Sequence, residues 1–457
     1  MIRDREDRLR LRMPNDRENT TGQQQKVPVS ENEIPRTGPL TEAVLLGAAS
    51  SGHASLDSDV SASASISSAL IGLLMSYAVL IVGNGLLGTL IPVRMMHSSM
   101  TSVQIGLVQS CYYVGFVIGA FINKGLIERI GQHRTFVAYA AAAAIVTLGF
   151  GAFTSPWVFA VIRLMSGFIF MGLYTAVESW LNGAVNNANR GRVFGSYLTI
   201  NYLAIGSGQF LLTVGDASGN TQLFIVATLF TAAVIPVTLM DGWPTRVRDD
   251  QLNKPRSIGW VESVRTMMAA TPLAVPGCII AGLLYSAFYA MTPVYLAHEG
   301  FSIDALSTIM GYALIGALVP QWPVGRLSDR YDRRTMIKWM AVCSAVSAAC
   351  LMLTHTPWVI RAALVVYVAG TFTQYGLIVS HINDRTDPVH RVATSTTLLI
   401  LFSAGGILGP LIASLMMALF GPHGLFVFAC VSACTLAFLA HSASGPRKPA
   451  AIRAGRA

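Results

Sequence analysis

Long apolar runs recur along most of this chain and predict membrane-spanning helices. From Ile66 onward, twelve mainly apolar stretches alternate with polar segments, most of them short. An α-helix rises about 1.5 Å per residue, so about 20 apolar residues cross the roughly 30 Å hydrocarbon core of a bilayer. The predicted spans are residues 66–93, 102–122, 135–154, 157–183, 193–214, 222–240, 273–296, 305–323, 336–354, 357–380, 393–419 and 424–441.

Two longer polar segments divide the chain into parts. Residues 1–64 mix both signs of charge without helical periodicity, which predicts a disordered tail. A polar segment between the sixth and seventh spans separates two groups of six. We therefore expect a tail at 1–64, an N-terminal six-helix bundle at 65–240, a central loop at 241–272, a C-terminal six-helix bundle at 273–441 and a second tail at 442–457.

Composition supports a membrane protein over a soluble one. The chain is 53% hydrophobic and only 12% charged, with a mean hydropathy of +0.54. Soluble domains carry about 25% charged residues. Because so few charges cannot cover a water-facing exterior, we expect an all-α membrane protein whose main partner is the lipid bilayer, and we expect it to be a monomer.

The basic residues sort to one side of the predicted membrane. If Lys338, at the edge of the ninth span, is counted with the loop before it, all but three of the 32 Lys and Arg residues lie in the two tails and the even-numbered loops. The exceptions are Arg94, Arg163 and Arg361. Basic residues concentrate in cytoplasmic loops. This asymmetry predicts a multi-pass protein of the cytoplasmic (inner) membrane with both termini in the cytoplasm. It also accounts for the net charge of +9 without a nucleic-acid partner.

The two groups of six spans are related in sequence. When the first half is shifted by 201 positions along the chain, five of its sites match sites of the second half. The matches are Pro92-Val93 with Pro293-Val294, His97 with His298, Glu128-Arg129 with Asp329-Arg330, Arg190 with Arg391, and Gly208 with Gly409. A repeated unit of this kind predicts two pseudo-symmetric bundles, as in transporters whose halves rock against each other.

A short charged segment between the eighth and ninth spans carries a recognisable motif. Gly325–Arg334 reads GRLSDRYDRR, which resembles the loop signature G-x-L-x-D-R-x-G-R-R of the major facilitator superfamily, with Asp332 in place of a glycine. Lys124–His133 is a degenerate copy in the first half. The alternatives are a gating contact, in which a carboxylate meets a helix N-terminus of the other half, and charge that only marks topology. The gating residues that we assign are Gly325, Asp329, Arg330, Arg333, Arg334, Glu128, Arg129 and Gly131.

The resemblance extends over residues 66–441 and is strongest to the YcaD-like branch of the superfamily. The segments that carry the branch are Val177–Ser179, Asn189–Arg192, Gly277–Ile280 and Gln321–Leu327. The resemblance implies a secondary transporter that moves a small-molecule substrate by alternating access. It implies neither a substrate nor a direction of transport.

Two charges within the fourth span are the leading candidates for transport chemistry. Glu178 is the only acidic residue within a predicted span, and a carboxyl group there suits proton coupling or substrate contact; the alternative is a structural pair with a loop arginine such as Arg192. Arg163, followed by Gly167, resembles the superfamily's helix 4 signature R-x-x-x-G, whose arginine is linked with proton movement. An arginine in a polar cavity also suits an anionic substrate, and the alternative is packing against backbone carbonyls.

Further candidates come from the spans that line the cavity in the superfamily, which are the first, fourth, seventh and tenth. They are Asn84, Tyr285, Tyr289, Gln374 and Tyr375, together with Arg361 near one end of the tenth span. Each has the alternative role of a helix–helix hydrogen bond, and Arg361 the alternative of extending to the membrane surface. Tyr285 and Tyr289, four residues apart, share a helix face.

Motifs for other chemistry are not found in the sequence. It has no G-x-x-x-x-G-K-[ST], no H-E-x-x-H and no G-x-S-x-G, and its nine histidines are scattered. We therefore expect no cofactor, no metal and no enzymatic activity, and we expect a secondary transporter that is coupled to protons. The competing hypotheses are a receptor or scaffold that does not transport and a membrane-embedded enzyme.

Overall fold

The computed structural model describes residues 40–185, 189–215, 219–239, 260–386 and 391–442. The chain forms two compact units, residues 1–60 and 61–457, which are described separately. All regular structure in the described residues is helical, as predicted. The helices are α1 (Leu40–His97), α2 (Ser102–Ile130), α3 (Gln132–Ala152), α4 (Pro156–Ala184), α5 (Arg190–Phe210), the 3₁₀ helix η1 (Leu211–Thr213), α6 (Thr221–Ala232), α7 (Val234–Thr238), α8 (Trp260–Ala270), α9 (Ala274–His298), α10 (Ile303–Gly316), α11 (Leu318–Arg330), α12 (Arg333–Leu353), α13 (Pro357–Asn383), α14 (Arg391–Phe420) and α15 (Gly424–Ser442).

Eleven spans among the described residues are long and apolar enough to cross a membrane, and they coincide with eleven of the twelve predicted spans. The remaining prediction, residues 193–214, coincides with α5, which is long enough but less apolar. Its polar residues include Ser196, Thr199, Asn201, Ser207 and Gln209. Two spans are interrupted, one between α6 and α7 and one between α10 and α11. The twelve-span fold class is confirmed.

Helix α1 begins within the segment that the sequence predicts to be a disordered tail. The sequence predicts disorder over residues 1–64, whereas α1 already begins at Leu40. The stretch from Leu40 is rich in Ala and Leu, which have high helix propensity, and it joins a helix that is already nucleated. Residues 1–39, the rest of this prediction, lie outside the described residues. The predicted central loop also contains a helix, α8.

The helix boundaries repeat at the constant shift found in the sequence. Under this shift the first residues of α2, α3, α4 and α5 fall on the first residues of α10, α12, α13 and α14. Thr101 caps α2 through its side chain, and its counterpart Ser302 caps α10 in the same way. Pro156 and Pro357 both occupy the first turn of their helices, where proline is favoured. The duplicated sequence therefore produces duplicated helix starts.

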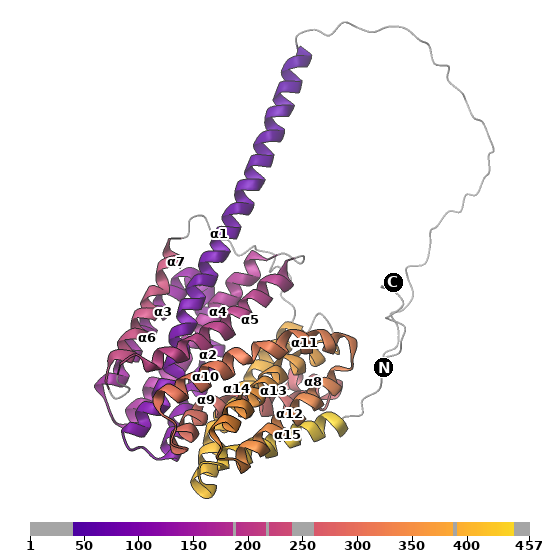
Figure 1. The fold of residues 1–457 in the computed structure, drawn as a ribbon. Coiled ribbons are helices and arrows are strands. Elements are labelled where there is room, and N and C mark those ends of the chain that lie inside the picture. Colours follow the sequence, from indigo (N-terminus) through magenta and orange to yellow (C-terminus); the bar gives the residue numbers. More distant parts are fainter. Residues whose placement is uncertain (1–39, 186–188, 216–218, 240–259, 387–390, 443–457) are drawn as a thin grey trace, which may run out of the picture. The chain divides into compact units, whose positions relative to one another are not determined.

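Each half is a bundle held by close helix pairs. In the first half α2 packs on α4, and α3 packs on α4 and α6; in the second half α9 packs on α14, and α12 packs on α13 and α15. The halves meet where α2 contacts α14 and where α5 contacts α10. Figure 1 shows the indigo-to-magenta helices of the first half beside the orange-to-yellow helices of the second.

Glycines permit the closest of these helix contacts. A Cβ on Gly167 of α4 would clash with the carbonyl oxygen of Tyr112, and a Cβ on Gly115 of α2 would clash with the carbonyl oxygen of Leu164. Apolar side chains provide no hydrophobic driving force between helices in lipid, so close backbone approach is what membrane helices use to associate. The glycine of the R-x-x-x-G motif therefore has a packing role between α2 and α4.

Candidate functional site

Arg163 is buried in the first half and is held by neutral groups. Its side chain lies on α4, and its Nε donates a hydrogen bond of 2.7 Å to Oε1 of Gln109 on α2. Its guanidinium lies 5.0 Å from the centroid of the Tyr112 ring. Both Arg163 and Gln109 are buried. In the described part of the chain no carboxylate pairs with Arg163, so neutral groups alone surround this buried guanidinium.

Glu178 lies five residues from the other end of the same span, which runs from Pro156 to Gly183, and, unlike Arg163, it is exposed. The hydroxyl of Tyr197 on α5 lies 3.4 Å from Glu178 Oε1 and donates to it. Tyr197 in turn packs its ring 4.6 Å from that of Tyr77 on α1, measured between centroids. The structural pairing with Arg192 that the sequence left open is not among the ion pairs of the described residues. Among the described residues, the side-chain hydrogen bond of the Glu178 carboxylate is the one from Tyr197.

Tyr174 lies between these two charges on α4 and connects them through aromatic contacts. On one side its ring is 6.4 Å from that of Tyr77, which leads to Tyr197 and Glu178. On the other side it is 6.2 Å from Phe116, which is 6.1 Å from Tyr112 beneath Arg163. The two charges do not meet, as the sequence predicts, but one continuous row of aromatic rings joins their surroundings.

The predicted residue Asn84 takes part in a pair that is repeated in the second half. Asn84 Nδ2 donates to the hydroxyl of Tyr174 over 3.4 Å. At the constant shift between halves, Asn84 falls on Tyr285 and Tyr174 falls on Tyr375. These two tyrosines also come together, because both pack on Phe402 of α14, at 5.5 and 4.5 Å between ring centroids.

Tyr289 completes an aromatic cluster in the second half. Its ring lies 5.0 Å from that of Tyr285 and 5.7 Å from that of Phe372 on α13. Tyr202 of α5, in the first half, approaches the same Phe372 at 6.5 Å. Tyr285, Tyr289 and Tyr375 are all half-buried. The structure therefore brings three of the predicted residues into one cluster that both halves contact.

Two predicted residues lie elsewhere. Gln374 is fully buried and donates from Nε2 to Ser344 Oγ on α12 over 3.1 Å, which is the helix–helix hydrogen bond that the sequence left as the alternative. Arg361 is exposed in the first turn of α13, with its guanidinium 5.5 Å from the centroid of the Phe301 ring. Neither contacts the aromatic cluster through an interaction in the described part of the chain.

The signature segment of the second half forms contacts within that half. Arg333 pairs with Asp329 at 3.3 Å and with Asp384, at the end of α13, at 2.7 Å. Gly325, Asp329 and Arg330 are exposed and Arg334 is half-buried. In the described part of the chain the ion pair of Asp329 is with Arg333, not with a helix of the first half. In the degenerate copy, Glu128, Arg129 and Gly131 are exposed.

The departure of Asp332 from the glycine pattern has a structural reason. Its counterpart Gly131 has φ of +86°, a conformation that favours glycine. Asp332 instead has φ of −61° and serves as the N-cap of α12, accepting from the backbone N–H of Arg334. The second half has thus exchanged a glycine turn for a side-chain cap.

Three side-chain hydrogen bonds among the described residues join the halves, and one of them, from Gln321 Nε2 of α11 to the Tyr202 hydroxyl of α5 at 3.3 Å, lies near the middle of these helices. The other two lie toward one end. Ser110 Oγ on α2 donates to the carbonyl of Ile407 on α14, and Ser307 Oγ on α10 donates to the carbonyl of Gln209 on α5, each at 2.7 Å. All four residues lie in the helix portions nearer the loops at 98–101 and 299–302. Glu178 and the signature segments lie toward the opposite end from the hydrogen bonds of Ser110 and Ser307.

Several residues of this site were not predicted from the sequence because α2 and α5 are outside the four spans expected to line the cavity. They are Gln109, Tyr112, Tyr197 and Tyr202, together with Tyr77 and Tyr174 on α1 and α4, where charge and amide groups were the expected signal. A detectable signal did exist: the segment QSCYY at 109–113 places a glutamine and two tyrosines within an otherwise apolar span.

Comparison with known proteins gives a family. A model of the Major Facilitator Superfamily matches residues 73–399. Proteins named as uncharacterized MFS-type transporter YcaD, from Escherichia fergusonii and from a strain of Escherichia coli, are each 27% identical over 380 residues, covering 83% of this chain and 97% of the relative. The branch resemblance read from the sequence is confirmed.

Solved structures agree on the fold. A mutant of the nucleoside transporter NupG matches with a TM-score of 0.71 at 15% identity, covering 82% of this chain and 99% of that one. A bacterial homolog of the human lysosomal transporter Spinster, inward-facing and occupied, matches with a TM-score of 0.67 at 14% identity, over 83% and 98% of the two chains. The fucose:proton symporter FucP of E. coli matches with a TM-score of 0.56 at 13% identity, over 82% and 98%.

Proposed function

This chain belongs to the major facilitator superfamily, and we propose that it is a secondary active transporter that moves a small organic solute across the cytoplasmic membrane, coupled to protons, by alternating access of its two halves. The observation that carries the proposal is the arrangement on α4. A buried arginine and an exposed carboxylate flank a row of aromatic rings that leads to a second cluster contacted by both halves.

Glu178 is the proposed proton carrier. A charge within a span is costly, so it is retained for a task. The support is its exposure and its hydrogen bond from Tyr197, whose ring leads through Tyr77 to Tyr174. Protonation of Glu178 removes the charge that the Tyr197 hydroxyl faces, so loading and unloading of a proton changes the contact between α4 and α5.

Arg163 and the aromatic cluster are the proposed solute contacts. A guanidinium without a carboxylate partner suits a carboxylate or phosphate on the solute, and aromatic faces suit its apolar or ring portion. Arg163, Asn84, Tyr285, Tyr289 and Tyr375 are the residues that we propose for this role. NupG and FucP, by their names, carry a nucleoside and a sugar, so nucleosides, sugars and organic acids are the compounds to test first.

We further propose that both termini are cytoplasmic and that the signature segments form the gate on that side. The support is the sorting of basic residues and the ion pairs of Arg333 with Asp329 and Asp384 at the end of the molecule away from the hydrogen bonds of Ser110 and Ser307. In alternating access those hydrogen bonds would open while contacts between the halves form at the signature segments.

A ligand screen identifies the solute. Purified full-length protein in detergent is heated with each compound, and a true ligand raises the unfolding temperature as its concentration increases. Arg163→Met should abolish the response to an anionic ligand while the variant itself still unfolds cooperatively. An undiminished response in Arg163→Met would remove Arg163 from recognition.

Reconstituted vesicles test the coupling. With an identified solute and an imposed pH gradient, we expect Glu178→Gln to abolish gradient-driven accumulation and leave solute exchange without a gradient intact. Glu262→Gln, at an exposed position of α8, is the matched control and should transport normally. Gradient-driven accumulation in Glu178→Gln at the unmodified rate would show that proton coupling does not use this residue.

A further inference from the structure

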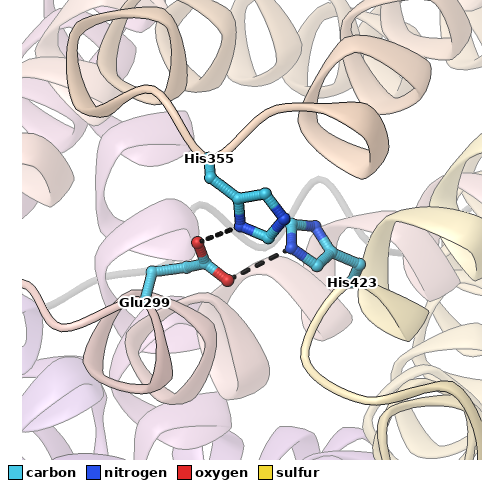
Figure 2. Close-up of side chains that lie close together, drawn as sticks. All are labelled: Glu299, His355 and His423. Carbon is cyan, nitrogen blue, oxygen red and sulfur yellow. Dashed lines mark hydrogen bonds and ion pairs between the residues drawn. The ribbon is translucent and has the colours of Figure 1, made fainter.

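Three side chains with metal-binding atoms meet at one end of the second half. Glu299 follows α9, His355 precedes α13 and His423 precedes α15. Glu299 Oε2 lies 3.1 Å from His355 Nδ1, and Glu299 Oε1 lies 3.2 Å from His423 Nε2. Figure 2 shows the carboxylate of Glu299 facing both imidazole rings, which come from separate loops. Distant parts of the sequence thus converge on one point, which the scattered spacing of the histidines did not reveal.

His423 leaves one ring nitrogen available beside the carboxylate. Its Nδ1 lies 3.0 Å from the carbonyl oxygen of Leu351, and because a carbonyl only accepts, Nδ1 donates this hydrogen bond. Its Nε2 lies 3.2 Å from a carboxylate oxygen of Glu299. His423 Nε2 is buried and makes no hydrogen bond in the described part of the chain, so it is a ligand atom without a hydrogen-bond partner.

Burial of the Glu299 carboxylate favours a positive charge beside it. Its side chain is only 10% exposed, and a buried carboxylate is costly unless positive charge compensates it. The His423 side chain is 19% exposed, whereas that of His355 is 77% exposed. The group is therefore closed on the side of Glu299 and open to solvent on the side of His355, which leaves a path for an ion to enter.

The first half shows what a cation does at the equivalent place. Arg94 near the end of α1 donates from Nη2 to Asn220 Oδ1 at 2.9 Å and from Nη1 to the carbonyl of Gly219 at 2.6 Å, which ties α1 to the start of α6. Under the constant shift Arg94 falls on Tyr295, and Asn220 and His423 are each the residue before the last span of their half. The Tyr295 ring packs 5.5 Å from the ring of His423. The second half thus has a tyrosine where the first half has this arginine.

We propose that Glu299, His355 and His423 form a binding site for Zn²⁺, with solvent completing the coordination. Two imidazoles and one carboxylate are a donor set that zinc takes when one position stays open. Zinc bonds of about 2.0–2.1 Å in a tetrahedron place neighbouring ligand atoms about 3.3 Å apart, close to the two observed separations. The bond from His423 Nδ1 to the Leu351 carbonyl is the outer contact that orients a zinc-binding histidine.

The ion links three loops, which connect α9 to α10, α12 to α13 and α14 to α15. It holds the loop after α9 to the loops before α13 and α15, at the same end of the molecule as the hydrogen bond between Ser307 and Gln209. Zinc thereby supplies in the second half the positive charge that Arg94 supplies in the first. The site does not include Arg163, Glu178 or the aromatic cluster, so zinc binding and solute binding are separable.

Zinc titration of the purified protein tests the site. Full-length protein in detergent is treated with a chelator and dialysed, and ZnCl₂ is then added while heat of binding and unfolding temperature are measured. We expect saturable binding of one ion per chain and a higher unfolding temperature with zinc but not with Mg²⁺, which prefers oxygen ligands. His355→Asn and His423→Asn should each weaken zinc binding at least about tenfold.

Matched controls separate this site from surface binding. His298→Asn removes an exposed histidine next to Glu299 and should leave zinc affinity unchanged. X-ray absorption should find two imidazole ligands at about 2.0–2.1 Å from zinc. Because His423 is largely buried, the exposed His355 provides the variant that keeps its fold. Absence of saturable binding in the unmodified protein, or equal affinity in His355→Asn, overturns the proposal. Stabilisation by acid without zinc uptake also overturns it, because a proton on the histidines would then be the cation.

Discussion

Gln109 and Arg163 form a hydrogen bond of 2.7 Å between α2 and α4, and it is the polar contact that holds a buried cation in the first half. A buried charged group that loses such a partner costs about 1–3 kcal/mol. We therefore expect Gln109→Met to lower the free energy of unfolding by that amount in detergent. Gln109→Met combined with Arg163→Met should lose less than the sum of the single losses. Equal unfolding temperatures for Gln109→Met and the unmodified protein would contradict this account of the pair.

Gly167→Ala should loosen α2 from α4. An added Cβ would clash with the carbonyl oxygen of Tyr112. Because this oxygen belongs to the backbone, no change of side-chain rotamer can relieve the clash. Overpacking of this kind costs typically about 1–3 kcal/mol. Gly183→Ala on the same helix is the control, because no heavy atom lies within 4 Å of its added Cβ. Thermal unfolding of both variants checks the prediction, and a loss in Gly183→Ala as large as that in Gly167→Ala would refute it.

Asp332→Ala should destabilise the start of α12. The substitution removes the side chain that accepts from the Arg334 backbone N–H, and loss of an N-cap costs about 0.5–2 kcal/mol. Asp332→Gly restores the glycine of the signature and should cost only a few tenths of a kcal/mol. Chemical denaturation of the two variants measures the difference. The prediction is wrong if glycine destabilises more than alanine.

Labelling of single cysteines tests the proposed orientation. Ser98→Cys and Lys124→Cys place exposed thiols toward opposite ends of α2, the first in the loop before the helix and the second in its last two turns. In a protein whose six native cysteines are replaced, a membrane-impermeant maleimide added to intact cells should label Ser98→Cys and spare Lys124→Cys until the membrane is opened. The reverse order would place the termini outside.

The fold was predictable because its determinants are local. Hydrophobic length fixed the spans, and proline, threonine and serine at helix starts fixed several boundaries, such as Pro156 and Thr101. Two features were not predictable from pattern alone. The helix from Leu40 lies in sequence rich in Ala, Leu and Ser without amphipathic periodicity, so only helix propensity signals it. The breaks after α6 and α10 are not marked by a change in hydrophobicity.

The site was predictable only in part, because contacts between distant helices are not encoded in local spacing. Scarcity of charge was enough to single out Arg163 and Glu178. It could not indicate that Gln109 would accept from Arg163, or that Gln374 would lie against Ser344. The convergence of Glu299 and His423 across more than a hundred residues depends on the packing of α9 and α15, which no motif anticipates.

The constant shift between the halves has a consequence for the evolution of this carrier. At that shift Arg163 falls on Leu364 and Glu178 falls on Val379. The two halves share a fold but differ in chemistry, because the first half has ionisable side chains at these two positions and the second half has apolar side chains at the equivalent positions. In the proposed transporter, a solute between the halves faces these ionisable groups on the side of the first half only, so the position of its own charge sets its orientation.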